Sequence, residues 1–63
     1  MKPRTLTPRQ REVVACLRLG LSNREIGQRL GITEGTVKIH LHSALGRTGL
    51  RNRTELALQR RRD

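Results

Sequence analysis

The sequence predicts an all-α domain built from four short helices. Three observations indicate this class: helix-start signals recur four times, glycines follow three of the predicted helices, and no stretch shows the period-two alternation of a half-buried strand. The 63 residues leave room for one domain and one small core. We therefore treat 1–63 as a single domain with a folded core at 6–58 and short basic ends that we expect to be flexible.

The first predicted helix spans about 8–19. Thr7 offers a side-chain acceptor, Pro8 takes the first helical position, and Gln10 stands three residues after Thr7, which is the pattern of a capping box. Gly20 then provides a left-handed stop. The apolar residues that recur at helical spacing within this segment are Val13, Val14 and Leu17.

The second and third predicted helices are joined by a very short connection. A second capping box at 22–25 begins a helix at about 23–30, which Gly31 ends. Thr33 caps the next helix, at about 34–47, only two residues after Gly31. The chain must therefore turn tightly between two helices set at a steep angle, which is helix-turn-helix geometry.

The third and fourth predicted helices each carry apolar residues at helical spacing. In the third, one stripe holds Val37, Leu41, Ala44 and Thr48, with Leu45 beside it. Gly49 follows as a stop, and residues 52–55 form a fourth cap of the same kind. This cap begins a last helix at about 53–61, whose apolar residues are Leu56, Ala57 and Leu58.

The composition favours a double-stranded nucleic acid as ligand. Fourteen Lys and Arg against five Asp and Glu give a net charge of +9 and an isoelectric point near 11.9. Twelve of the fourteen are Arg, whose planar guanidinium suits phosphates and base edges, although a GC-rich genome also enriches arginine. Because aromatic residues are absent, single-strand readers that stack bases are disfavoured.

Other function classes lack the residues that they require. The lone Cys16 cannot form an internal disulfide, and no apolar run suffices for a membrane span or a signal peptide, so we expect a cytoplasmic protein without a membrane partner. His40 and His42 diverge by roughly 200° on a helix, so we expect no metal and no cofactor. No nucleophile stands beside a base, and we predict that the protein is not an enzyme.

The helix at 34–47 offers a second face opposite its apolar stripe. At about 100° per residue, Ile39 lies on that face and should point at solvent or at a partner. Its neighbours there are Gly35, His42 and Gly46, with Lys38 and Ser43 on the flanks. In a DNA major groove, Lys38 would donate to guanine O6 and N7, His42 would bond a base or a phosphate, and Ile39 would pack on a thymine methyl. The alternative is an exposed isoleucine among unrelated polar residues.

Further side chains are predicted to contact the DNA backbone. Thr33 and Thr36 stand at the start of the 34–47 helix, where free backbone N–H groups and the helix dipole favour a phosphate, and Thr33 also caps the helix. The remaining predicted backbone contacts lie at helix ends and in a loop: Arg24, Arg47, Arg51 and Arg53. The alternative for each of these arginines is a side chain that contacts only solvent. We interpret His40 as a packed or phosphate-facing residue.

Four segments stand in the order and spacing of a known family: LTPRQREV, GLSNREIGQRLGI, EGTVKIHL and LRNRTE. Through them, residues 6–58 resemble the LuxR-type DNA-binding domain, also called the GerE or NarL/FixJ type. The resemblance implies four helices, of which the third reads DNA and the fourth pairs with a second copy, here through Leu56 and Leu58. It places base contacts at Lys38, Ile39 and His42, and backbone contacts at Thr36 and Arg47.

Several residues depart from the family pattern. Gln10 stands where glutamate is usual, and Gly27 replaces the usual alanine where the second and third helices cross. Three further positions, which usually carry larger aliphatic residues, hold Cys16, Ala44 and Thr48. We therefore expect an underpacked core. The last helix should then be partly disordered in isolation, or stabilised by DNA or by dimerisation.

Together these features predict a sequence-specific, double-stranded DNA-binding transcriptional regulator. We expect a homodimer on an inverted repeat with half-sites about one helical turn apart, located at the nucleoid when bound and with RNA polymerase as a further partner. In the family this domain usually follows a receiver or a ligand-binding domain. The chain is therefore either the excised output domain of a response regulator or a stand-alone regulator.

Two alternatives remain at this stage. The first is a protein-interaction module that heterodimerises through the last helix with a full-length LuxR-type regulator and blocks it. The second is the DNA-contacting region of a sigma factor, which has a similar turn, although the LRNRTE segment and the fourth helix disfavour it.

Overall fold

The computed structural model describes residues 6–58, which form four helices in the predicted order. The helices are α1 (Pro8–Arg18), α2 (Asn23–Leu30), α3 (Glu34–Thr48) and α4 (Arg53–Leu58). Residues 6–58 contain no strand, so the predicted all-α class is confirmed. The predicted flexible ends, at 1–5 and 59–63, and the predicted last turn of the fourth helix, at 59–61, lie outside the described residues.

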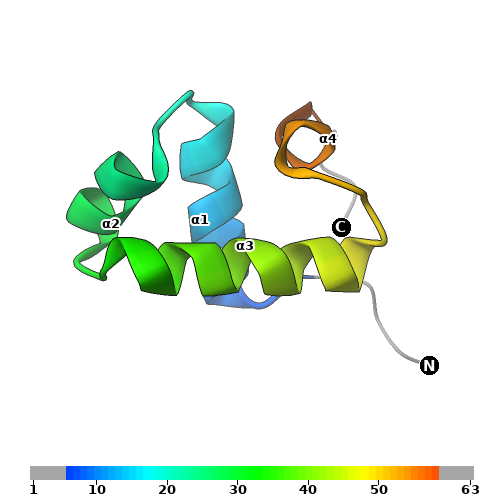
Figure 1. Ribbon diagram of the computed structural model, residues 1–63, viewed down its shortest axis with the longest axis horizontal. Coiled ribbons are helices and arrows are strands. Elements are labelled where there is room, and N and C mark those ends of the chain that lie inside the picture. The colour runs from blue at the N-terminus through cyan, green and yellow to red at the C-terminus, as the bar shows by residue number, and fades with distance from the viewer. Residues whose placement is uncertain (1–5, 59–63) are drawn as a thin grey trace.

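The arrangement of the helices leaves α3 on the outside of the molecule. α2 and α4 lie on the same side of α3, near its two ends, and α1 crosses behind it between them (Figure 1). α3 packs against each of the other three helices. One long helix therefore forms a wall of the domain, and the remaining three cover its inner face.

The helix starts fall at the predicted capping residues. The Thr7 hydroxyl accepts a hydrogen bond from the backbone N–H of Gln10 at 3.2 Å, and the Gln10 side chain accepts from the backbone N–H of Thr7 at 3.0 Å. Ser22 and Glu25 form the same reciprocal pair at 3.1 and 2.8 Å. Each pair satisfies two backbone donors that would otherwise lack a partner at the start of a helix.

The start of α4 differs slightly from the predicted form. The Asn52 side chain accepts from the backbone N–H of Glu55 at 2.9 Å, as a cap does. The Glu55 carboxylate, however, accepts from the backbone N–H of Arg51 at 2.9 Å instead of from Asn52. The return bond therefore reaches one residue further back along the chain and ties the loop before α4 to its first turn.

The helix ends also agree with the predicted stops. Gly20, Gly31 and Gly49 have φ angles of 88°, 74° and 78°, a conformation that other residues adopt only with strain. α1 ends at Arg18, one residue before the predicted boundary, and α3 continues to Thr48, one residue beyond it. Such single-residue differences are ordinary at frayed helix ends.

All four helices contribute to one hydrophobic core. Its buried members are Val13, Val14, Cys16 and Leu17 from α1, Ile26 from α2, Val37, Leu41 and Ala44 from α3, and Leu56 from α4. The apolar stripe predicted for the third helix is therefore the side that the domain buries. Because α3 buries this side alone, its opposite side remains at the molecular surface.

At Gly27, the expected underpacking is wrong. Gly27 is buried, and a Cβ atom added to it would lie 2.6 Å from the carbonyl oxygen of Ile32. The same turn closes onto α2 through a 2.9 Å hydrogen bond from the backbone N–H of Ile32 to the carbonyl of Gly27. The connection between the two helices therefore occupies the space that an alanine side chain needs.

Thr48 has a role that the packing argument overlooked. Its hydroxyl donates to the carbonyl of Ala44 at 2.9 Å and accepts from the backbone N–H of Leu50 at 3.3 Å. A larger aliphatic residue at this position would lose both bonds, so the hydroxyl links the end of α3 to the loop that leads into α4. Underpacking around Cys16 and Ala44, which are both buried, stays a prediction.

Candidate nucleic-acid interface

The exposed side of α3 presents the residues predicted to read bases. Ile39 is 64% exposed, whereas Val37 on the opposite side of the same helix has no exposed surface. Lys38 and His42, which flank Ile39 in sequence and on the helix surface, are exposed as well. Also exposed on this side are Gly35, Ser43 and Gly46. The two-sided arrangement predicted from helical periodicity is therefore present in the folded domain.

This reading face, defined as Gly35, Lys38, Ile39, His42, Ser43 and Gly46, carries no acidic side chain. The one acidic residue of α3 is Glu34, in the first turn, and Arg47 stands in the last turn. Glycines at both ends of the face and one bulky apolar residue near its middle give it little side-chain volume. Such a helix surface has the size and charge that a DNA major groove admits.

The start of α3 holds two hydroxyl groups close together. The Thr33 hydroxyl accepts from the backbone N–H of Thr36 at 3.1 Å, which confirms its predicted capping role. The two hydroxyl oxygens lie 2.9 Å apart and share a hydrogen bond. Thr33 is exposed and Thr36 is partly buried. Their predicted phosphate contacts therefore fall where the positive end of the helix dipole meets the surface.

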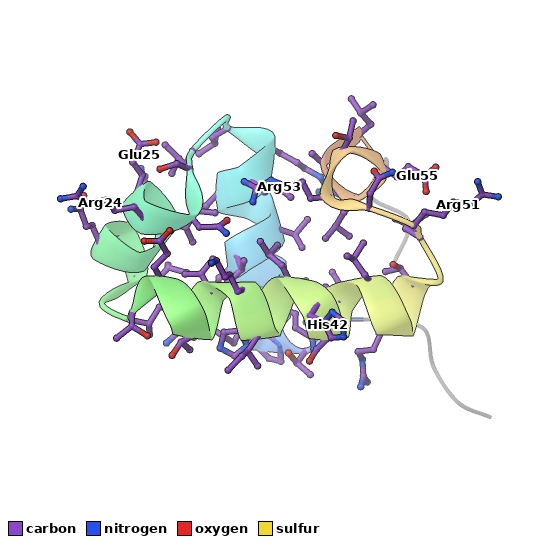
Figure 2. The ribbon with its side chains drawn as sticks, in the orientation of Figure 1. Arg24, Glu25, His42, Arg51, Arg53 and Glu55 are labelled. Carbon is purple, nitrogen blue, oxygen red and sulfur yellow. The ribbon has the colours of Figure 1, made fainter. Side chains whose placement is uncertain are left out.

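The predicted backbone-contacting arginines are distributed around α3. Arg24, on α2, and Arg51, in the loop before α4, lie toward opposite ends of α3, while Arg53 lies between α2 and α4 (Figure 2). Arg47 is exposed on α3 itself. Arg24 and Arg51 therefore flank the reading helix and Arg47 stands on it, whereas Arg53 is set back among the other helices.

A comparison with known protein families decides which family the chain belongs to. The sequence profile described as bacterial regulatory proteins of the luxR family matches residues 4–59. The chain belongs to the LuxR family. The resemblance expected from the four sequence segments is thereby confirmed, and the four observed helices fit a helix-turn-helix domain of this family.

Similar proteins carry names of the same kind. The chain is 47% identical over 55 residues to YhjB of Escherichia coli K12, which is named as an HTH-type transcriptional regulator, and 47% identical over 53 residues to the transcriptional regulatory protein LnrK of Bacillus subtilis 168. It is 43% identical over 53 residues to the nitrate/nitrite response regulator NarL of Escherichia coli K12. These matches cover 87%, 84% and 84% of this chain.

The matched region is a minor part of each of these relatives. It covers 28% of YhjB and 24% of both LnrK and NarL, so the chain spans about a quarter of the length of the curated relatives that it matches. The similarity therefore concerns one domain of those proteins.

In this LuxR-family domain, the two residues predicted to pair two copies differ in their exposure. Leu56 is only 1% exposed and packs in the core, so it cannot offer its side chain to a second copy, and its assignment to a pairing surface is corrected. Leu58 is 76% exposed and remains available. The two residues are two positions apart, which places them about 200° apart around a helix and explains the different outcomes.

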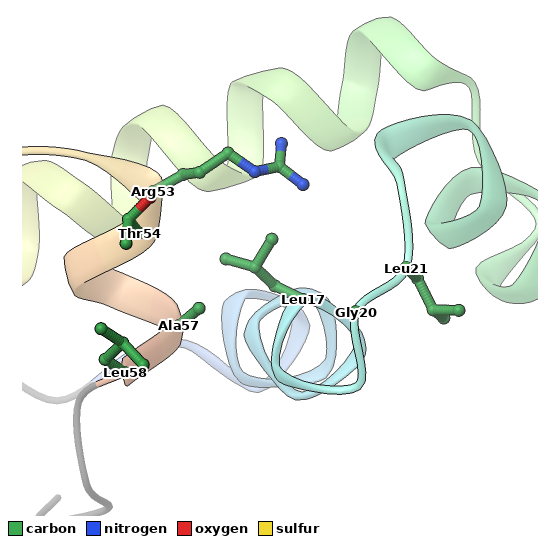
Figure 3. Close-up of a pocket in the computed structure, with 7 residues that line it drawn as sticks. All are labelled: Leu17, Gly20, Leu21, Arg53, Thr54, Ala57 and Leu58. Carbon is green, nitrogen blue, oxygen red and sulfur yellow. The ribbon is translucent and has the colours of Figure 1, made fainter.

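Leu58 borders a shallow groove between α4 and the end of α1. The groove has a volume of about 270 Å³ and is lined by Leu17, Gly20, Leu21, Arg53, Thr54, Ala57 and Leu58 (Figure 3). An apolar surface therefore exists on the side of the domain that carries α4.

Sequence reasoning missed one side chain in this region. Asn23, the first residue of α2, accepts a hydrogen bond from the Arg53 guanidinium at 2.6 Å. Asn23 and Arg53 are thirty positions apart, so no local pattern could have paired them.

The described residues also bear on metal binding and on membrane insertion. Within 6–58, no three side chains among His, Cys, Asp and Glu gather closely enough to hold a metal ion. No described helix combines the length and the apolar character needed to cross a bilayer.

Proposed function

We propose that this domain binds double-stranded DNA sequence-specifically, with α3 in the major groove, and that it regulates transcription as a homodimer on an inverted repeat. Membership of the LuxR family and the names of the relatives support the DNA-binding part of this proposal. The observation that carries it is the 64% exposure of Ile39 in the middle of a reading face without acidic groups.

Three residues of the reading face have a chemical role in this proposal. Lys38 donates to guanine O6 and N7, and His42 bonds a base edge or a phosphate. Ile39 packs on a thymine methyl group, which is the apolar feature of the major groove. The three side chains together read adjacent bases, because they lie within about one turn of one helix.

The backbone contacts come from residues around the reading face. Thr33 and Thr36 bond a phosphate at the start of α3, and Arg24, Arg47 and Arg51 bond phosphates along the groove edges. These contacts hold α3 in register without reading sequence. Arg53 was predicted in the same role, but its guanidinium is bound to Asn23.

Pairing of two copies uses the surface that carries α4. Leu58 remains exposed there and borders the groove between α4 and α1, whereas Leu56 is buried in the core. Two copies related by a two-fold axis would place their α3 helices in successive major grooves, about 34–36 Å apart. The operator is then an inverted repeat.

The experiment that tests the proposal is selection of bound duplexes from a random pool, at physiological salt, with the wild-type domain and with Ile39→Ala in parallel. Wild type is expected to enrich a palindromic consensus, and Ile39→Ala to lose the preference for thymine at one position of each half-site. Circular dichroism of both proteins controls for folding. Because Ile39 is exposed, its replacement should leave the fold intact.

Other outcomes of this selection would change the conclusion. A consensus with one half-site would contradict the dimer and preserve sequence reading. No enrichment by wild type would contradict the DNA-reading proposal altogether. It would favour the protein-interaction module, which needs only the exposed apolar surface around Leu58.

A further inference from the structure

The contact between Arg53 and Asn23 joins two helices that do not otherwise meet. The Arg53 Nη1 atom donates to the Asn23 Oδ1 atom at 2.6 Å. Within residues 6–58, the backbones of α2 and α4 do not approach one another, although each of these helices packs against α1 and α3. A long side chain therefore spans a distance that the two helices leave open.

The Arg53 side chain also runs along the groove between α4 and α1. It extends from the start of α4 past Leu17 (Figure 3), and it lines the same groove as Leu17 and Leu21. The methylene stem of an arginine can cover apolar groups while the guanidinium bonds a distant acceptor. A guanidinium is also a charged donor, so its hydrogen bond to an amide oxygen is stronger than one between neutral groups.

α4 depends on such contacts for its orientation. It spans six residues, Arg53–Leu58, and a helix of this length is not stable without tertiary packing. It contributes one buried side chain, Leu56, to the core. Ala57, next to Leu56, packs against the core as a partly buried side chain. Both anchors lie in the second half of α4, so they hold its first residue less firmly. A contact at the first residue of α4, away from both anchors, restricts its movement.

We infer that Arg53 is a positioning residue that fixes the direction of α4 relative to α2 and α3, and thereby sets the half-site spacing that a dimer accepts. This inference rests on the proposed function, in which α4 pairs the two copies and α3 reads DNA. The Asn23 side chain stands at the first residue of the helix-turn-helix unit, so its contact with Arg53 links the pairing helix directly to the reading unit.

The test measures affinity for a set of duplexes that carry the selected half-sites with the spacer changed by one or two base pairs. Wild type is expected to prefer one spacing. Arg53→Ala and Asn23→Ala should each reduce that preference by about threefold or more, the scale of one hydrogen bond. The double variant should lose no more than either single variant, because both changes remove the same contact.

Two matched variants separate positioning from other roles. Asn23→Asp keeps an oxygen acceptor at the same position and should retain the wild-type spacing preference. Arg51→Ala removes one positive charge from the neighbouring loop. It should weaken binding at every spacing alike and make the salt dependence shallower, as loss of a phosphate contact does.

Folding is checked on the free proteins by hydrogen exchange. Arg53→Ala should accelerate exchange of the α4 amides while the amides of α1 and α3 keep wild-type protection. If Arg53→Ala lost the fold, Asn23→Ala would carry the test, because Ser22 and Glu25 still cap α2.

The inference is overturned if Arg53→Ala keeps the spacing preference, lowers affinity at every spacing and reduces the salt slope by about 0.9 per protomer, while Asn23→Ala is unchanged. Arg53 would then contact a phosphate. It is also overturned if wild type binds specifically but shows no spacing preference. Failure of the proposed function looks different, because wild type would then show no specific binding to any duplex in the set.

Discussion

At the residue scale, prediction succeeds where a side chain's role follows from its position on one helix. Ile39 was placed outside and Val37 inside by counting about 100° per residue, and both placements are confirmed. Leu56 was wrongly assigned to the pairing surface together with Leu58, because nothing in the local sequence shows that Leu56 faces the core. The Asn23–Arg53 bond was not predictable, because it depends on where the fold brings two distant residues.

The residues proposed to read bases and those proposed to hold the backbone should respond differently to substitution. Lys38→Ala or His42→Ala should lower affinity for the selected duplex about tenfold and leave affinity for a scrambled duplex nearly unchanged. Arg47→Ala should weaken both complexes by the same factor, since a phosphate contact carries no sequence information. Fluorescence anisotropy on the two duplexes at fixed salt measures these ratios.

Two results would contradict the proposed division between base-reading and backbone-contacting residues. If Lys38→Ala and His42→Ala weakened the selected and scrambled complexes equally, they would not read bases. A loss of specificity in Arg47→Ala would likewise remove it from the backbone set. Thermal unfolding of each free variant serves as the control for stability.

At the element scale, the helix boundaries followed from short local signals. A cap is decided by residues three positions apart, so Thr7 with Gln10 and Ser22 with Glu25 could be recognised from the chain alone. The surroundings of Gly27 could not, because they depend on how closely the following turn folds back onto α2. Local patterns therefore define where an element begins and ends but not the clearance between elements.

Two helical glycines offer a matched test of this distinction. Gly46→Ala should raise the free energy of unfolding by about 0.5–1 kcal/mol, because Gly46 has open space around it and alanine restricts the unfolded chain. Gly27→Ala brings the same change in helix propensity but places a methyl group 2.6 Å from the carbonyl oxygen of Ile32, so it should lower that free energy. Urea unfolding followed by circular dichroism compares the two variants with wild type. Equal stabilisation by both changes would show that the turn carrying Ile32 can move away from the new methyl group without loss of stability.

At the scale of the whole molecule, charge is the dominant property. A net charge of +9 on 63 residues gives a field that attracts any phosphate polymer, so affinity alone does not demonstrate sequence reading. Composition predicted this attraction without any structure. The composition says nothing about which surface would meet the DNA, and the proposal for that surface rests on the two sides of α3.

The salt dependence of binding should report the number of phosphates held. If each protomer neutralises about five phosphates, the logarithm of affinity should fall with the logarithm of salt concentration with a slope near −4.5 per protomer. Titrations between about 50 and 200 mM salt with selected and scrambled duplexes measure the slope. A slope near zero would contradict the backbone contacts, since these release counterions when they form.

The two-sided construction of α3 separates two kinds of evolutionary constraint. Substitutions at Lys38, Ile39 and His42 leave the buried side of the same helix untouched, because none of the three belongs to the core. If these residues read bases as proposed, descendants of this domain can acquire new operator preferences through a few surface changes while their folding remains protected. The same separation makes α3 a suitable scaffold for engineering altered recognition, with thermal stability expected to vary little across a library at those three positions.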